Sequence, residues 1–96
     1  MPRAIHLTPR GVVTDDTELF ERVKEYLGKT GVKYVEQHDG VWHKCYVSDI
    51  RGGDLVILMK NFAEQVGDVD VWLFMSKIYS SKKTGESGSE QGDRPP

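Results

Sequence analysis

The segment DGVWHKCYVSDIRGGDLVILMKN, residues 39–61, decides how this chain is interpreted. It contains two dipeptides, Asp39-Gly40 and Gly52-Gly53, that are typical of two-residue β-hairpin turns. The residues beside these turns are rich in aromatic and aliphatic side chains, which strands favour. The pattern therefore predicts three consecutive strands over 33–38, 41–50 and 54–60.

An amphipathic helix is expected before these strands. In TDDTELFERVKEYLGK, residues 14–29, the apolar side chains recur at the spacing of a half-buried helix. Asp15 and Glu18 form a capping-box-like start, and Gly28 suits the C-terminal stop. The sequence predicts a helix over about 15–28, preceded by a short edge strand at 4–7.

A further apolar segment, VDVWLFM at residues 69–75, predicts a fourth strand of the meander after a connection at about 62–68. The segments 54–60 and 69–75 are continuously apolar, which in an antiparallel sheet indicates burial on both sides. One helix covers only one side, so we expect the sheet to close on itself or to meet another molecule.

The predicted fold class is therefore α+β. One amphipathic helix (about 15–28) packs on a strongly bent antiparallel sheet or small barrel of four to five strands, in the order β-α-β-β-β-β. Residues 1–79 form the single globular domain. Residues 80–96 are predicted to be a disordered polar tail, because they contain no aliphatic or aromatic side chain.

The alternation along the predicted strands assigns side chains to two faces. Counting across the first turn gives three cross-strand pairs: His38 with Val41, Glu36 with His43, and Tyr34 with Cys45. The face predicted to form the core beneath the helix carries Val35, Trp42, Tyr46, Ile50, Leu55, Ile57 and Met59. The ionisable side chains near the turn lie on the other face.

Composition narrows the possible partners and location. Thirteen Lys and Arg against fifteen Asp and Glu give a net charge of −2, which does not indicate nucleic-acid binding. No apolar run approaches the roughly 18 residues of a membrane span. The single cysteine cannot form an internal disulfide, so an intracellular location, cytoplasmic or nuclear, is expected.

His43 and Cys45 invite a catalytic or metal-binding interpretation. A histidine beside a cysteine can activate the thiol, and Glu36 or Asp39 could orient the imidazole. However, residues i and i+2 of a strand stand parallel rather than converge, and no CxxC or HxxxH pair is present. We therefore expect no enzyme, no catalytic residue, no metal site and no cofactor, and a structural role for Cys45.

Residues 33–78 resemble a Tudor-type barrel of the SH3-like class. The turn Asp39-Gly40 precedes Trp42-His43-Lys44-Cys45, where that family tends to have Trp-Tyr-Arg-Ala, and Gly53-Asp54 leads to an apolar strand ending at the aromatic Phe62. The resemblance implies a small barrel. It also implies an aromatic cage for methylated lysine or arginine, although His43 replaces a usual cage tyrosine.

These observations predict a non-catalytic interaction module that binds a protein or peptide through the sheet edge and the aromatic end of the barrel. The predicted binding residues are Tyr34, Trp42, His43 and Phe62, of which Tyr34 and Phe62 are expected to be accessible near strand ends. The alternative is a small homodimeric accessory or inhibitor protein that blocks a larger partner. A thiol-dependent enzyme or metal site at His43 and Cys45 is a distant third possibility.

Overall fold

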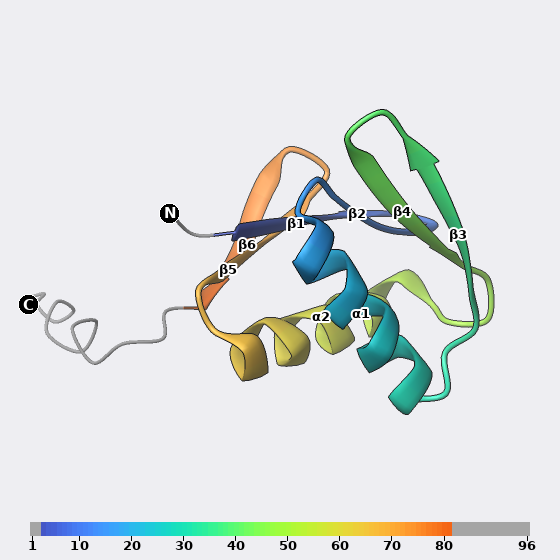
Figure 1. Ribbon diagram of the computed structural model, residues 1–96. Coiled ribbons are helices and arrows are strands. Elements are labelled where there is room, and N and C mark those ends of the chain that lie inside the picture. Colours follow the sequence, from blue (N-terminus) through green and yellow to red (C-terminus); the bar gives the residue numbers. More distant parts are fainter. Residues whose placement is uncertain (1–2, 82–96) are drawn as a thin grey trace, which may run out of the picture.

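The computed structural model describes residues 3–81 and contains six strands and two helices (Figure 1). Along the chain they are β1 (Arg3–Thr8), β2 (Gly11–Thr14), α1 (Thr17–Lys29), β3 (Tyr34–Asp39), β4 (Trp42–Val47), α2 (Gly52–Val66), β5 (Val69–Leu73) and β6 (Ser76–Ser81). The α+β class is confirmed. The order is ββαββαββ, so the predicted count of one helix and four to five strands is wrong.

The largest correction concerns the predicted strand at 54–60, which belongs to α2. Its buried side chains are Leu55, Met59, Phe62 and Ala63, which recur at i, i+4, i+7 and i+8 and so line one face of a helix. Gly52-Gly53 is the first turn of this helix and not a hairpin turn. A continuous apolar run has no strand periodicity, and here the helical spacing decides.

Helix α1 confirms the predicted amphipathic helix, with shifted ends. Its N-cap is Asp16, whose carboxylate accepts the backbone N–H of Leu19 at 2.9 Å. At the other end Gly31 adopts a φ of 81°, and the N–H of Val32 donates to the carbonyl of Leu27 at 2.9 Å. This is a Schellman motif, which makes Gly31 rather than Gly28 the terminating glycine.

The six strands form one mixed sheet in the order β3-β4-β2-β1-β5-β6. Strands β1 and β5 are parallel, while the other neighbouring pairs are antiparallel. The sheet has two free edges, β3 and β6, so it is open and the predicted closed barrel is wrong. The parallel pair requires a crossover, and α2 provides it between β4 and β5.

Two strands escaped prediction, and one predicted strand is too long. β2 is short, and β6 is rich in serine, so neither has a strong apolar signal. β5 ends at Leu73, and Phe74 and Met75 form the loop to β6. Because β6 reaches Ser81, the predicted boundary at residue 79 is two residues short; the rest of the predicted tail, 82–96, lies outside the described residues.

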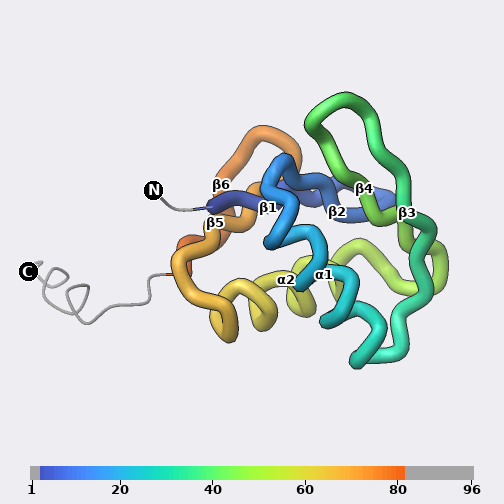
Figure 2. Tube along the Cα trace, viewed as in Figure 1, coloured from blue at the N-terminus to red at the C-terminus, as the bar shows by residue number. Residues whose placement is uncertain are grey.

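Both helices pack on the same face of the sheet, as Figures 1 and 2 show. The core between helices and sheet consists of Ile5, Leu7, Val12, Leu19, Phe20, Val23, Leu27, Cys45, Leu55, Met59, Phe62, Ala63, Val69 and Val71. The prediction that Val35, Trp42 and Tyr46 face the helix is therefore reversed, because Cys45 and its alternate neighbours take that side.

The β3–β4 hairpin differs from the predicted register by two residues. Its loop is Gly40-Val41, with Gly40 at a φ of 64°, so that Asp39 pairs with Trp42 and His38 with His43. An even shift leaves every side chain on its own face. Glu36, His38, His43 and Cys45 therefore still share one face, as predicted.

Within residues 3–81, neither helix is long and apolar enough to cross a membrane.

Candidate binding surface on the open sheet face

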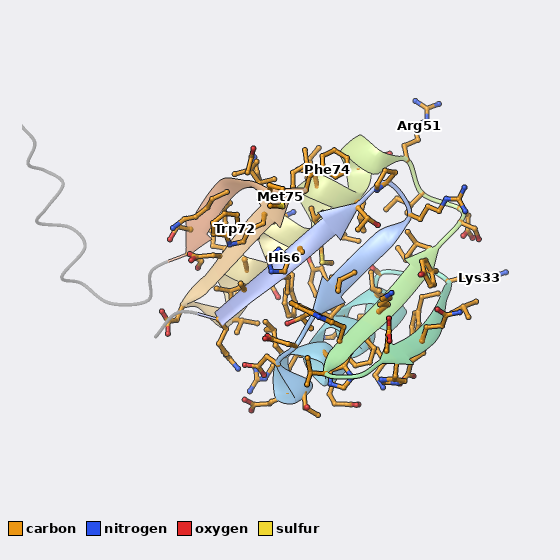
Figure 3. The ribbon with its side chains drawn as sticks, turned by 90° about the horizontal axis from the view of Figure 1, so that it is seen from above. His6, Lys33, Arg51, Trp72, Phe74 and Met75 are labelled. Atoms are coloured by element: carbon orange, nitrogen blue, oxygen red, sulfur yellow. The ribbon has the colours of Figure 1, made fainter. Side chains whose placement is uncertain are left out.

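The face of the sheet turned away from both helices, which we call the open face, carries a cluster of aromatic rings (Figure 3). Since Ile5 and Leu7 of β1 point into the core, His6 between them points to the open face. Its ring centroid lies 6.0 Å from that of Trp42 and 6.1 Å from that of Trp72. Three strands, β1, β4 and β5, thus bring three rings together.

A shallow hollow of about 360 Å³ lies beside this cluster. It is lined by His6, Thr8, Val13, Trp42 and Lys44. Most of these side chains present carbon to the hollow, and the Lys44 ammonium is 4.0 Å from the Asp39 carboxylate. The hollow therefore suits an apolar group, with charge only at its rim.

The loop between β5 and β6 presents two large apolar side chains to solvent. Phe74 is 59% exposed and Met75 is 89% exposed. Phe74 has a φ of 56°, a left-handed conformation that is unfavourable for a bulky side chain. Its backbone N–H donates to the carbonyl of Leu7 at 3.1 Å, which ties the loop to β1. The fold therefore maintains a strained conformation that leaves an aromatic ring in water.

Exposed large hydrophobic side chains collect on this side of the molecule. Among residues 3–81 they are Val35, Val41, Trp42, Ile57, Phe74 and Met75. Only Ile57 belongs to a helix; the others lie on the open face or in the two hairpin loops. Both hairpin loops lie on the side of the sheet away from the helices (Figure 1). Such a concentration is typical of a protein interaction surface.

The opposite face carries a chain of hydrogen bonds at the border of the core. His38 Nε2 lies 2.9 Å from the Glu36 carboxylate, His38 Nδ1 lies 2.7 Å from His43 Nδ1, and His43 Nε2 lies 3.3 Å from Thr17 Oγ1. The His43 ring also stacks on the buried Phe20, with centroids 5.1 Å apart. The chain fastens the β3–β4 hairpin to α1.

These contacts determine which ring nitrogens carry protons when both histidines are neutral. A carboxylate only accepts, so His38 donates from Nε2 and accepts at Nδ1 from His43, which in turn accepts the Thr17 hydroxyl. His38 and Lys24 both donate to Glu36 and lower the pKa of its carboxyl. Every imidazole nitrogen has a partner in this arrangement, which leaves none free to act as a base or a metal ligand.

Cys45 lies in the core beneath the helices and is fully buried. Burial, and secondarily the negative charge of Glu36, raises the pKa of its thiol to about 12. A thiol with this pKa stays protonated near neutral pH and is a poor nucleophile. Among the described residues, no group of three or more His, Cys, Asp and Glu side chains has a metal-binding arrangement.

The four predicted binding residues do not form one site. Trp42 lies on the open face and is 40% exposed, whereas Tyr34 and His43 lie on the helix-covered face at opposite ends of the β3–β4 pair. Phe62 is in α2 rather than at a strand end, and only 2% of it is exposed, because it packs in the core beside Tyr26. The expectation that Phe62 is accessible is wrong.

Sequence reasoning missed most of the open face. His6, Val13, Trp72, Phe74 and Met75 were not predicted as binding residues, although all belong to or border the surface described above. A hairpin loop made of Phe74 and Met75 contains none of the usual turn residues, so no local signal marks it. The alternation of Ile5, His6 and Leu7 was the available signal for His6.

No protein-family model matches the chain, and no curated protein or solved structure is significantly similar to it. The resemblance to Tudor domains thus stays a prediction. The apolar strand ending at Phe62 on which it depends is helix α2 in the structure.

Proposed function

We propose that this protein is a non-catalytic interaction module whose open sheet face binds another protein. The observation that carries the proposal is that both helices cover one face of the sheet, while the other face leaves Trp42, His6 and Trp72 beside an apolar hollow. Exposed aromatic side chains next to a pocket are the usual anchors of protein–protein interfaces.

Two features support the non-catalytic part of the proposal. The protonated, buried Cys45 lacks both the thiolate and the access that a nucleophile needs. The nitrogens of His38 and His43 are engaged in hydrogen bonds with each other, Glu36 and Thr17. The most reactive residue types of the chain thus serve to hold the hairpin and the core together.

The proposal moves the binding surface predicted from sequence. The aromatic end predicted to bind is replaced by the open face and the Phe74-Met75 loop, and Trp42 alone is retained from the predicted set. The earlier alternative, a homodimeric accessory protein, depended on two strands buried on both sides. One of these strands is helix α2, so that argument no longer supports the alternative.

A capture experiment with matched variants tests the proposal. The immobilised protein is used to isolate binding proteins from its source cells, and each is then purified and titrated against wild type, Trp42→Ser and Ile57→Ser. Ile57 is the control, because it is 60% exposed but lies on α2. We expect Trp42→Ser to weaken binding at least about tenfold, the loss of one anchor, and Ile57→Ser to leave it unchanged.

The opposite pattern would contradict the proposal. If Ile57→Ser abolishes binding while Trp42→Ser retains it, the helices and not the open face form the interaction surface.

A further inference from the structure

The open face combines a protruding apolar group and an apolar recess on one surface. The Phe74-Met75 loop, which we call the knob, projects on the side away from the helices, and the hollow between Trp42 and His6 opens on the same side (Figures 1 and 3). A surface that carries both a knob and a recess fits its own copy about a two-fold axis, with each knob in the opposite recess.

From this arrangement we infer that a second copy of the chain covers the open face, with the knob of each copy seated in the hollow of the other. The inference rests on the proposed function and names the partner of that same surface.

The charges on this face are compatible with self-association. The ammonium of Lys44 is 4.0 Å from the Asp39 carboxylate, and that of Lys77 is 3.5 Å from Asp70. Because these cations are paired within the chain, two copies brought face to face meet no block of like charge. The same pairing leaves little free positive charge on this face for a nucleic-acid phosphate backbone.

The remainder of the chain offers no apolar cover. The sequence after Ser81 contains no aliphatic or aromatic residue, so it has no side chain suited to the hollow. The large apolar side chains exposed on the described residues lie mainly on the open face itself and its loops. A second open face is thus the apolar surface that this protein itself supplies.

The conformation of Phe74 points to a role for the knob. A φ of 56° at a bulky residue is unfavourable, and the exposed ring recovers little of this cost by packing within its own chain. Burial of the ring in the hollow of a second copy would supply the missing compensation.

Sedimentation equilibrium on the full 96-residue chain, from about 1 μM to about 1 mM, tests the inference. We expect a monomer–dimer equilibrium, with a dissociation constant raised at least about tenfold by Phe74→Gly and by Trp42→Ser, and unchanged by Ile57→Ser. Glycine adopts a φ of 56° without strain, so Phe74→Gly keeps the fold while it removes the knob.

Mixing the two weakened variants gives a sharper test. A dimer of Phe74→Gly lacks both knobs, and a dimer of Trp42→Ser has two damaged hollows. A mixed dimer restores one intact contact, because Phe74 of one copy meets Trp42 of the other. We therefore expect an equimolar mixture to associate more tightly than either variant alone.

Two results would overturn the inference. One is a wild-type protein that stays monomeric over the whole range, and the other is a dimer that neither variant weakens. In the first case, capture of a different protein that depends on Trp42 would leave the proposed function standing, so the two failures are distinguishable.

Discussion

The two faces of the sheet are built from the same strands, yet they differ in how their apolar side chains are used. On the helix-covered face, side chains such as Ile5 and Val71 are fully buried against α1 and α2. On the open face, Trp42 and Val35 retain much of their exposure although neighbouring strands surround them. The comparison separates side chains that stabilise the fold from side chains that are available for binding.

The largest expected effect comes from the covered face. Phe20 is buried and stacks on His43, so Phe20→Ala removes a large core side chain and leaves a cavity. We expect it to lower the free energy of unfolding by about 3–5 kcal/mol in urea titrations. Phe20→Leu retains most of the volume and serves as the milder variant. A loss below about 1 kcal/mol for the alanine variant would mean that this face is not the core.

The close approach of β2 and β4 gives the next largest effect. A Cβ added at Gly11 would lie 1.9 Å from the carbonyl oxygen of Cys45, so Gly11→Ala forces the strands apart. We expect a loss of about 1–3 kcal/mol or more in thermal or urea unfolding.

Gly28 provides the matched control for this alanine substitution. No neighbouring heavy atom lies within 4 Å of a Cβ added at Gly28, which is near the end of α1. Gly28→Ala should therefore stabilise the protein by about 0.5–1 kcal/mol. Equal losses for the two variants would contradict the described packing of β2 on β4.

The buried thiol predicts a loss of stability at alkaline pH. The pKa of Cys45 is raised from 9.0 to about 12, so the folded state holds the proton more tightly than the unfolded state. The contribution is complete below pH 9.0 and is lost as the pH rises towards 12. The advantage of wild type over Cys45→Ala should thus shrink by up to about 1.4 kcal/mol per pH unit in that interval.

Alkylation gives an independent check of the same burial. Iodoacetamide near neutral pH should label Cys45 only after the protein unfolds. Rapid labelling of the native protein would show a thiolate accessible to solvent and would revive the catalytic interpretation.

The smallest expected effect on folding belongs to the open face. Because Trp42 is 40% exposed and lies outside the core, Trp42→Ser should cost only about 1 kcal/mol or less in urea titrations of dilute protein. The same variant should have the largest effect on binding. A cost near that of Phe20→Ala would place Trp42 in the core and remove the distinction between the faces.

Sequence reasoning recovered the elements that have a clear period or turn. The stripe of Leu19, Val23 and Leu27 predicted α1, and Asp39-Gly40 located the β3–β4 hairpin within two residues. It failed at α2, because a run of apolar residues fits a buried strand as well as a helix when only its hydrophobicity is considered. The spacing of Leu55, Met59 and Phe62 carried the helical signal.

The site depended on this error. With 54–60 counted as a strand, one helix remained to cover the sheet, and the face with Trp42 and Val35 was assigned to the core. Once α2 joins α1 on the other face, Trp42 becomes the accessible residue and Phe62 becomes buried. No local pattern reports the parallel pairing of β1 with β5, which places His6 beside Trp72. That contact depends on the topology of the whole chain.

The most direct test of the central claim, that one chain leaves its open face uncovered, is acrylamide quenching of tryptophan fluorescence. The chain has two tryptophans, Trp42 and Trp72, and both lie on the open face, so the Trp72→Phe variant reports on Trp42 alone. At a concentration low enough to give monomers, we predict efficient quenching and a red-shifted emission. Emission that is blue-shifted and protected from acrylamide in the monomer would contradict the account.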